Sequence, residues 1–480
     1  MTAGERPLNE LGRWDDMGDD TRAALLGRGR AAVFDPDLRE SVREIIEAVR
    51  ADGDKAVAAA LRRFDGCDVP ADRLMVTDAE FRAARDAVEP ALVAAIRDSI
   101  GHVRRFNEQI AARGDWSFES EPGLHVGEKV SPVASAGLFV PSGKGSYPSV
   151  LIQLATPAVV AGVPEITVAV PPVPGSPGTV DPAVLVAADE LGIRSVFRCN
   201  GPAGIAAMAF GTATVPRVMK IVGPGGPPVT CAQLEVQRFG VVTCVLLGAS
   251  ESLIVADDWA DPRLLAADLL NEAEHGPDSS SVLVTDSAAL LGRVQAELRT
   301  QVARLPEPQR SYALRALGVN GGAVLVRDLA QAAEVANRYA PEHMQVAVRD
   351  PDALLGLLHD AGEILVGQWT PISAANFVIG CPAALPTAGF AKVNGGVTVE
   401  AFRKRTAVAR ADRAALSRMS ATAVTLARHE GFPAHAAAVE ARFPNQADFP
   451  HQADFPHQAG FPHQAGFPHA ARSPEGHHAD

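Results

Sequence analysis

Short apolar segments alternate with helical stretches over most of the chain, and this alternation restricts the fold more than any other feature of the sequence. The expected strands of the first series are AGLFVP, EITVAV, SVFRC and KIVG. Those of the second series are SLIVAD, SVLVTD, GGAVLVRD, MQVAV and EILVG. Strands that are joined through helices form parallel sheets with helices on their faces. The sequence therefore predicts an α/β protein with two parallel-sheet lobes.

Helical patterns flank the alternating region. Apolar residues recur at helical spacing from about Pro36 to Phe64, and a second helical stretch runs from about Asp78 to Ile110. The alanine-rich segment from about Ala411 to Arg442 is also expected to be helical. The six-residue unit F-P-x-Q-A-D/G then recurs from Phe443 to Phe467, and proline at every sixth position prevents a regular helix. We therefore expect residues 443–480 to form a low-complexity disordered tail, whose histidines are more simply an incidental repeat than a metal site.

Composition narrows the classes of function. Acidic residues outnumber basic ones, 57 to 44, for a formal net charge of -13. This balance argues against sequence-independent nucleic-acid binding, which needs a basic face. An anionic dinucleotide remains compatible with it, because backbone N–H groups and helix N-termini bind phosphate without net positive charge. The N-terminus lacks a secretory pattern and no uncharged run approaches the ~20 apolar residues of a membrane span, so we expect a cytoplasmic protein.

The side chains most suited to bind a metal are not the cysteines. The five cysteines are scattered, and no two form a C-x-x-C pair, which predicts neither a finger-type zinc site nor a disulfide framework. Glu272 and His275 are a better candidate, since residues three apart share one face of a helix and could converge on one cation. Gly276-Pro277 would end that helix. Taken alone, such a pair is more often a solvated helix face.

Two further segments carry a carboxylate and an imidazole. Glu342-His343 follows a proline and precedes the expected strand MQVAV, a junction where α/β enzymes place reacting groups. These two side chains could supply a general base and a water activator, although a polar turn is the commoner explanation. Glu430 and His435 stand near the start of the last expected helix, where they would be read as surface residues.

Phosphate-binding fingerprints are absent or incomplete. The segment Ser142–Ser146 resembles a P-loop only superficially, because Leu138 stands where its first glycine should be. No G-x-G-x-x-G follows an expected strand. The glycines of Gly223–Gly226, after the strand KIV, could let the backbone approach a pyrophosphate, although an ordinary turn explains them equally well.

Taken together, these segments resemble the histidinol dehydrogenase family, collinearly from about Val42 to Ala438. The order of AEHGPDS and PEH is specific to that family. The other segments that carry the resemblance are GD, FDG, SPVASAGLFVPSGKGSYPSVLIQLATPAVVAGVPEITVAVPP, IAAMAFGTATVPRV, KIVGPGG, ASESLIVAD, LPTAGFAKVNGGVTVEAF and EGFPAH. The resemblance implies two Rossmann-like parallel-sheet lobes with small helical N- and C-terminal segments, but it does not by itself settle the substrate.

The resemblance implies a Zn2+ site with four ligands, which correspond here to Glu272, His275, Asn376 and His435. Two of the four depart from the family pattern, since the family has glutamine in place of Glu272 and aspartate in place of Asn376. The changes are complementary, so the site keeps two imidazoles, one carboxylate and one amide. Because carboxylates bind zinc better than amides do, we expect a divalent metal site to survive.

The resemblance also implies the reaction and the assembly. Glu342 and His343 would be catalytic: His343 takes the alcohol proton while hydride passes to NAD, and Glu342 activates water for a second oxidation to the acid. The family forms a homodimer whose C-terminal segment crosses to the partner, so Glu430 and His435 would complete the neighbour's site. The residues expected to bind the substrate are Ser250, Glu272, His275, His343, Asn376, Glu430 and His435.

The positions that contact NAD in the family correspond to Phe139, Ala203 and Gly226. Phe139 keeps a ring but lacks the family's tyrosine hydroxyl, and the other two offer no side-chain hydrogen bond. Ala383 replaces a histidine expected near the substrate. These departures predict weaker or altered NAD binding. They favour another polar alcohol as the substrate, with histidinol as the alternative.

The resemblance divides the chain into five segments. Residues 1–24 are expected to pack with the C-terminal region. Residues 25–138 and 250–396 would form the lobe with the metal and catalytic residues, and residues 139–249 the NAD-binding lobe. Residues 397–442 would be a helical segment exchanged in the dimer, followed by the tail. The expected function is NAD-dependent oxidation of a small-molecule alcohol, with no nucleic-acid or membrane partner; the alternative is a non-catalytic paralogue that keeps the fold as a binding module.

Overall fold

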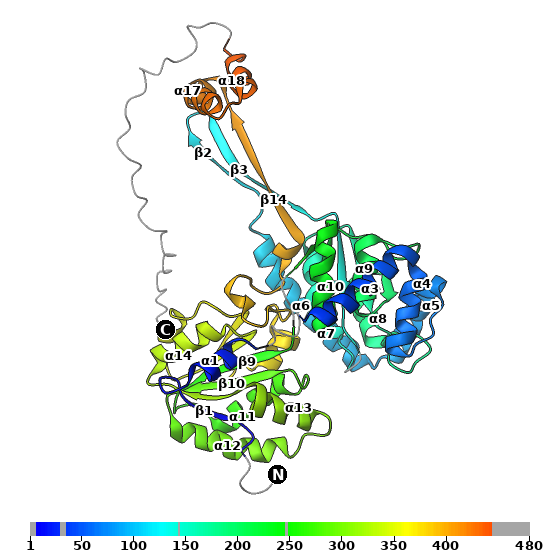
Figure 1. Ribbon diagram of the computed structural model, residues 1–480, viewed down its shortest axis with the longest axis vertical. Helices are drawn as coiled ribbons and strands as arrows, with labels where there is room; N and C mark the ends of the chain where they lie inside the picture. Colours follow the sequence, from blue (N-terminus) through cyan, green and yellow to red (C-terminus); the bar gives the residue numbers. More distant parts are fainter. Residues whose placement is uncertain (1–5, 29–34, 143–144, 245–247, 444–480) are drawn as a thin grey trace, which may run out of the picture. The chain divides into compact units, whose positions relative to one another are not determined.

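The computed structural model describes residues 6–28, 35–142, 145–244 and 248–443, so the predicted disordered tail lies outside the described residues. The chain divides into two compact units (Figure 1). The main unit contains residues 1–114 and 130–405, and the second unit contains residues 115–129 and 406–480. The main unit holds two separate parallel sheets, which confirms the predicted α/β class with two parallel-sheet lobes. Among the described residues, no helix is both long and apolar enough to cross a membrane.

The first sheet has six strands, all parallel, in the order β1-β11-β10-β9-β12-β13. Successive side chains of its strands point to opposite helical layers. Ile254 and Leu283 pack with α11, α12 and α13, whereas Leu253 and Val282 pack with α1, α14 and α15. This burial on both faces explains why its strands read as continuous apolar runs. The strands are β1 (Glu10–Arg13), β9 (Glu251–Ala256), β10 (Ser280–Thr285), β11 (Gly322–Leu325), β12 (His343–Ala347) and β13 (Glu363–Val366). The helices are α1 (Asp19–Leu26), α11 (Pro262–Ala273), α12 (Ala288–Val302), α13 (Gln309–Arg315), α14 (Leu329–Tyr339) and α15 (Pro351–Leu355).

The second sheet has five parallel strands in the order β6-β5-β4-β7-β8. Leu138 and Val168 pack with α5, α6, α7 and α8 on one face, and Phe139 and Ala169 pack with α3, α4, α9 and α10 on the other. The strands are β4 (Ser135–Phe139), β5 (Glu165–Val170), β6 (Val196–Arg198), β7 (Lys220–Val222) and β8 (Val242–Thr243). The helices are α3 (Pro36–Asp52), α4 (Asp54–Ala60), α5 (Asp78–Ala87), α6 (Pro90–Ala111), α7 (Pro148–Val160), α8 (Pro182–Glu190), α9 (Gly201–Phe210) and α10 (Pro227–Val236).

Two groupings of segments differ from those expected. Residues 25–138 were assigned to the lobe of the six-stranded sheet, but the apolar faces of α3 to α6 are buried against the five-stranded sheet. Residues 1–24 were expected to pack with the C-terminal region; instead β1 pairs with β11, where Glu10 lies opposite Ala323. In both cases, helix periodicity shows which face is buried but not which sheet buries it.

Both long helical stretches expected near the N-terminus are interrupted. The stretch from Pro36 to Phe64 breaks at Gly53, whose φ of 55° is left-handed and separates α3 from α4. The stretch from Asp78 to Ile110 breaks before Pro90, because the residue that precedes a proline disfavours helical geometry.

The second unit contains most of a three-stranded sheet with the order β14-β3-β2, and two helices that pack on each other. The elements are β2 (Trp116–Glu121), β3 (Leu124–Pro132), β14 (Arg403–Ala411), α17 (Arg413–His429) and α18 (Pro433–Glu440). β2 and β3 are antiparallel, and β2 is exposed along its whole length. The expected C-terminal helix is thus two helices, since Gly431 has a φ of 80° and Pro433 begins α18.

Candidate active site

A cavity of about 890 Å³ in the main unit is lined by residues of both lobes. This volume is typical of a small-molecule or coenzyme site. The six-stranded sheet reaches the cavity with the amino ends of its strands, at Glu251 of β9 and His343 of β12. The five-stranded sheet reaches it with the residues that follow its carboxyl ends, Pro141 after β4 and Pro224 after β7. The two sheets therefore present opposite edges to one space.

Glu272 lies in the last turn of α11 and is only 1 % exposed. Its Oε1 accepts hydrogen bonds of 2.8 Å from Asn376 Nδ2 and from Asn271 Nδ2. Its Oε2 lies 3.7 Å from His275 Nε2. Asn376 comes from the π-helical turn Ala375–Ile379, which follows the short helix α16 (Ile372–Ala374). The structure thus brings together three of the four predicted metal ligands.

The direct contact between Glu272 and Asn376 gives the two departures from the family pattern a physical meaning. One acid and one amide share a hydrogen bond, so exchanging them between the two positions keeps one charge and one amide in the same place. Two acids there would repel each other, and two amides would leave the site without its charge.

Glu272 remains a carboxylate despite its burial. Burial raises the pKa of this group, but the charges of His275 and His343 and the two amide hydrogen bonds outweigh that effect, so the pKa is lowered. Ser250 Oγ lies 3.3 Å from His275 Nδ1, which leaves Nε2 of this imidazole on the side of Glu272. Glu272 Oε2, an anionic oxygen, and His275 Nε2 therefore face the same space.

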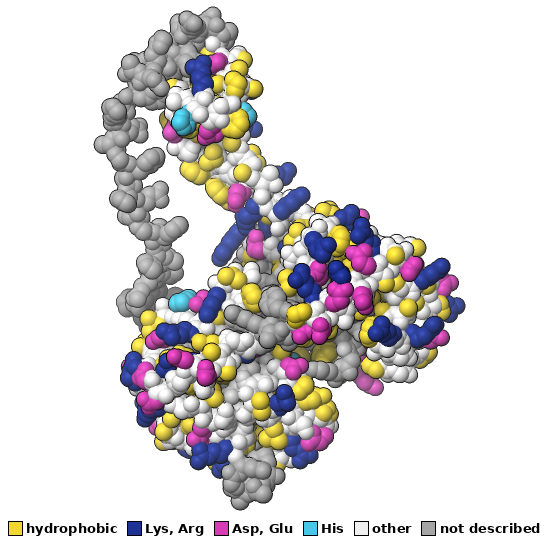
Figure 2. All heavy atoms as spheres, viewed as in Figure 1, with side chains coloured by type: hydrophobic (Ala, Val, Ile, Leu, Met, Phe, Trp, Pro, Cys, Tyr) yellow, Lys and Arg dark blue, Asp and Glu magenta, His cyan; other side chains and the backbone are white. Residues whose placement is uncertain are grey.

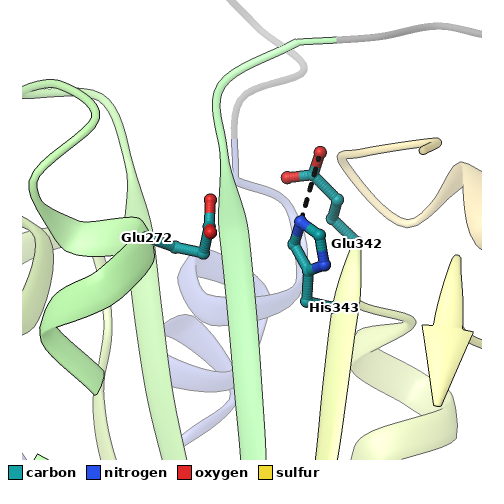
Figure 3. Close-up of side chains that lie close together, drawn as sticks. All are labelled: Glu272, Glu342 and His343. Atoms are coloured by element: carbon teal, nitrogen blue, oxygen red, sulfur yellow. Dashed lines mark ion pairs between the residues drawn. The ribbon is translucent and has the colours of Figure 1, made fainter. Parts of the chain in front are cut away.

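Glu342 and His343 lie where β12 begins, and Figure 3 shows them beside Glu272. Glu342 Oε2 accepts a 2.9 Å hydrogen bond from the backbone N–H of Glu251. Glu342 Oε1 lies 3.8 Å from His343 Nε2, and His343 Nδ1 lies 2.6 Å from Glu363 Oε1. Both residues of the predicted catalytic pair are buried and line the cavity.

Burial and neighbouring charge shift the pKa values of this pair. Burial disfavours the imidazolium of His343, but three surrounding carboxylates outweigh it and raise its pKa to about 9; these are Glu272, Glu342 and Glu363. Burial, reinforced by the negative charge of Glu272, raises the pKa of Glu342 well above its ordinary value. Such shifts are characteristic of groups that exchange protons in an enclosed site.

The residues present fit a zinc ion. Two ligands of a tetrahedral zinc lie about 3.4 Å apart, given metal–ligand distances of about 2.0–2.1 Å. The 3.7 Å between Glu272 Oε2 and His275 Nε2 is close to that separation. Since Nδ2 of Asn376 is bonded to Glu272, its Oδ1 is the atom left to reach a cation. Ligand atoms of Glu272, Glu342 and His343 also lie within 4.8 Å of one another.

The edge of the five-stranded sheet offers backbone rather than charged side chains. A Cβ on Gly223 would lie 2.1 Å from Phe139 O, and one on Gly225 would lie 2.5 Å from Val229 Cβ, so only glycine fits this turn. The turn leads into the N-terminus of α10, and Gly225, Gly226 and Thr230 line the cavity. The first two residues of α10 are prolines, which have no N–H, and the N–H of Val229 donates to Gly226 O. A phosphate here would therefore meet the backbone of the glycine turn and the positive end of the helix dipole.

Of the three residues expected to contact NAD, only Gly226 lines the cavity. Phe139 and Ala203 are each 1 % exposed and belong to the hydrophobic cluster between the sheet and α9. Both side chains point into the core and not into the cavity, and the roles of these two positions in NAD binding stay predictions.

Ser250 and Ala383 line the cavity, as their predicted place near the substrate requires. His435, on α18, and Glu430, which follows α17, belong to the second unit, and both are exposed. Their roles in metal and substrate binding stay predictions.

Two further acids, Glu251 and Glu363, contact the catalytic pair expected from the sequence. Glu251 accepts a hydrogen bond from Ala388 N and pairs with Arg28, while its own N–H holds Glu342. Glu363 bonds the ring of His343. Each is an acid at the first position of an otherwise apolar strand, ESLIVA and EILV. A charge at the start of a buried strand was the available signal.

The fold and the site together define a class of protein: a two-lobed α/β protein that presents a carboxylate–imidazole cluster and a glycine-rich helix N-terminus to one cavity. The chain belongs to the histidinol dehydrogenase family, whose model matches residues 29–443. It is 42% identical over 421 residues to "Histidinol dehydrogenase homolog 2" of Mesorhizobium japonicum, with 87% of this chain and 94% of that protein covered. It is 40% identical over 401 residues to "Histidinol dehydrogenase" of Synechocystis sp., with 83% of this chain and 92% of that protein covered.

The solved structures agree with this assignment. The crystal structure of histidinol dehydrogenase from Elizabethkingia anophelis matches with a TM-score of 0.85 and 28% identity, and the match covers 92% of this chain and 99% of that one. The two-lobed architecture is therefore that of the family across nearly the whole chain.

Proposed function

We propose that this chain catalyses the zinc-dependent, NAD-linked oxidation of a polar alcohol through an aldehyde to an acid. The observation that carries the proposal is the hydrogen-bonded pair Glu272–Asn376, which lies with His275 in the cavity that also holds Glu342 and His343. Both altered ligand positions thus remain part of a site with one carboxylate, one amide and one imidazole.

The roles of the chain's residues follow from their atoms. His343 Nε2 is the ring nitrogen nearest the Glu342 carboxylate, and it would accept the proton of the substrate hydroxyl as hydride leaves the carbon. Glu342 would take a proton from the water that adds to the aldehyde before the second hydride leaves. Glu272, His275 and Asn376 would hold the zinc, which polarises the substrate oxygen when bound. Gly225, Gly226 and the N-terminus of α10 would hold the phosphates of NAD.

The substrate class is a small polar alcohol, with histidinol as one member and not the favoured one. Ala383 lies in the cavity where the family's histidine would stand, so this position offers no ring to the substrate. Glu430 could pair with a substrate amine.

The experiment that tests the proposal follows NADH absorbance of the purified protein with histidinol, other amino alcohols, and sulfonated or hydroxylated diols. We expect turnover of at least one of these, together with about one zinc per chain. An absence of turnover with all of them and an absence of bound metal would contradict the proposal.

We further propose a homodimer in which α17 and α18 of one chain complete the site of the other with Glu430 and His435. Co-expression of Glu272→Ala with His435→Ala tests this exchange. Each variant alone should be inactive, but a mixed dimer would hold one intact site, so a random mixture should recover about a quarter of the wild-type activity. No recovery, with mixed dimers verified by two different tags, would exclude the exchange.

A non-catalytic binding module is the second candidate. The burial of Phe139 and Ala203 favours it, because the cavity then lacks two of the three expected contacts with NAD. Calorimetric titration separates the two: NAD binding in the micromolar to low millimolar range supports the enzyme, and no binding in the millimolar range supports the module.

A further inference from the structure

The carboxylate of Glu363 belongs to the site, but the proposed reaction gives it no role. Glu363 is the first residue of β13 and His343 is the first residue of β12, and the parallel register of the two strands places them opposite each other. Their side chains meet at 2.6 Å between Glu363 Oε1 and His343 Nδ1. The side chain of Glu363 is 6 % exposed and that of His343 is 1 % exposed.

The backbone fixes this contact. The N–H of Glu363 donates a 3.1 Å hydrogen bond to the carbonyl oxygen of Glu342. A Cβ on the preceding Gly362 would lie 2.5 Å from that same oxygen, so the starts of the two strands approach as closely as only glycine allows. The main chain from which the Glu363 side chain extends is therefore held beside the start of β12.

The acids around the His343 imidazole lie beside different atoms of the ring. Glu363 holds Nδ1 from β13, while Glu342 lies at 3.8 Å from Nε2 on the cavity side. Glu272 approaches from α11. Burial, and then the charge of Glu363, raise the pKa of the Cys381 thiol. Among the described residues, Oε2 of Glu363 has no hydrogen-bond partner, so its single hydrogen bond goes to His343.

We propose that Glu363 is a positioning residue, which fixes the tautomer of His343 with the proton on Nδ1 and so leaves Nε2 as the atom that accepts the substrate's hydroxyl proton. This inference rests on the proposed function and deepens it. When Nε2 takes the proton, both ring nitrogens carry hydrogen and the ring becomes positive; the Glu363 carboxylate then faces a cation instead of a neutral ring, which stabilises the charged state. The electron pair of the broken C–H bond leaves with the hydride, so the step is balanced.

The first test needs no activity. In the full-length protein labelled with 15N-histidine, long-range proton–nitrogen spectra report which ring nitrogen carries hydrogen, and the signals of His343 are assigned by their loss in His343→Asn. We expect an Nδ1–H tautomer in the resting protein at alkaline pH, with a strongly deshielded proton. A ring with its proton on Nε2 in the wild type overturns the inference, whether or not the protein is an enzyme.

The second test uses Glu363→Gln and Glu363→Ala. The amide oxygen of glutamine can still accept from Nδ1–H, so Glu363→Gln should keep the tautomer and lose the charge, whereas alanine loses both. We expect kcat to fall about 10- to 100-fold in Glu363→Gln and further in Glu363→Ala, with KM changed less than about threefold. An unchanged kcat in both variants, with an active wild type, overturns the inference and leaves the proposed function intact.

Asp268→Asn is the matched control. Asp268 is as buried as Glu363, and its Oδ2 accepts a 2.8 Å hydrogen bond from Gln345 on the same strand as His343. It does not contact the imidazole ring. If Asp268→Asn lowered kcat and altered the His343 signals as much as Glu363→Gln does, the effect would belong to strand β12 in general and the inference would be wrong.

Discussion

The two sheets of the main unit meet the same cavity with opposite edges, and each edge offers a different chemistry. The five-stranded sheet presents its carboxyl edge, where a glycine turn leads into the N-terminus of α10. The six-stranded sheet presents its amino edge, where Glu272 lies in the last turn of α11 and Glu342 follows the end of α14. Helix N-termini favour anions and helix C-termini favour cations. One edge is therefore suited to phosphate and the other to a metal ion and an imidazolium.

This difference also explains the kinds of residue found at each edge. Phosphate is bound by backbone, so the five-stranded edge depends on glycines such as Gly223 and Gly225, beside which no side chain fits. A cation needs charged side chains, so the six-stranded edge depends on acids that are buried and individually hydrogen-bonded. Figure 2 shows acidic and basic side chains interspersed over the visible face of the main unit. The acids of the site, Glu272, Glu342 and Glu363, are buried.

We call the amino edge of the six-stranded sheet the cation edge and the carboxyl edge of the five-stranded sheet the phosphate edge. The largest effect should come from removing Glu272, the acid of the cation edge. Glu272→Ala deletes the ligand that accepts hydrogen bonds from Asn376 and Asn271, and we expect loss of bound zinc with a fall in kcat of about 10³-fold or more. Metal analysis and NADH absorbance are the measurements. The neighbouring exposed Glu274→Ala is the control and should keep both properties. NAD affinity should stay within about threefold, because the phosphate edge is untouched; its loss would show that the two edges are not independent.

Exchanging the acid of Glu272 with the amide of Asn376 tests whether these two positions bind zinc as a pair. Asn376→Asp places two acids 2.8 Å apart in place of the present hydrogen bond, and Glu272→Gln removes the only charge of the pair. Each single change should weaken zinc affinity about 10- to 100-fold, and the double change should restore most of it. Competition with a chromogenic chelator measures the affinity. Losses that simply add in the double variant would mean that the two positions do not act as a pair.

A change at the phosphate edge should lower the affinity for NAD and leave bound zinc unchanged. Gly225→Ala forces a Cβ to within 2.5 Å of Val229, which displaces the start of α10. We expect NAD affinity to fall about tenfold by calorimetry, while bound zinc is unchanged. Gly292→Ala, in α12 of the other lobe with nothing within 4 Å of its Cβ, is the control and should leave both unchanged. Loss of zinc in Gly225→Ala would contradict the separation of the two edges.

The smallest effect should be on stability, in the lobe of the five-stranded sheet alone. Glu190 on α8 pairs with Arg85 and with Arg97, whose Nη2 lies 2.9 Å away, and the hydrogen bond from Arg97 is the main cause of its lowered pKa. A lowered folded-state pKa stabilises the protein above the ordinary value near 4.5 and ceases to do so as pH falls through the folded-state value.

Glu190→Gln should therefore lower stability by about 1 kcal/mol at neutral pH, and the difference should vanish as pH falls through the folded-state pKa of Glu190. Denaturant unfolding at several pH values measures it. Glu108→Gln, an exposed position on α6, is the control and should show no such pH dependence. A difference that persists in acid would assign the effect to packing and not to charge.

The local sequence predicted the helices and strands better than it predicted which of them pack together. The segments EITVAV and SVLVT form β5 and β10, because each is an apolar run bounded by polar or turn residues. The strand Arg403–Ala411 was missed, since eight of its nine residues are exposed and it has no apolar face to reveal it. The packing of α3 to α6 on the five-stranded sheet also escaped prediction, since periodicity carries no information on distant partners.

The candidate site was predictable where the chemistry is local. Glu272 and His275 are one helical turn apart, and Glu342 and His343 are adjacent, so their spacing alone suggested that they act together. Glu363 joins them only through the register of β12 and β13, which no pattern in the sequence reports. The family resemblance singled out Asn376. The structure shows that its side chain is hydrogen-bonded to Glu272, which relates the change at one position to the change at the other.

The pairing of β1 with β11 has a consequence for synthesis. Glu10 is translated long before its partner Ala323, which follows all the strands of the five-stranded sheet and β9 and β10 of the six-stranded sheet. β1 therefore has no strand to pair with at this position until β11 has been made. We infer that this edge of the six-stranded sheet closes only after all five strands of the other sheet have been translated.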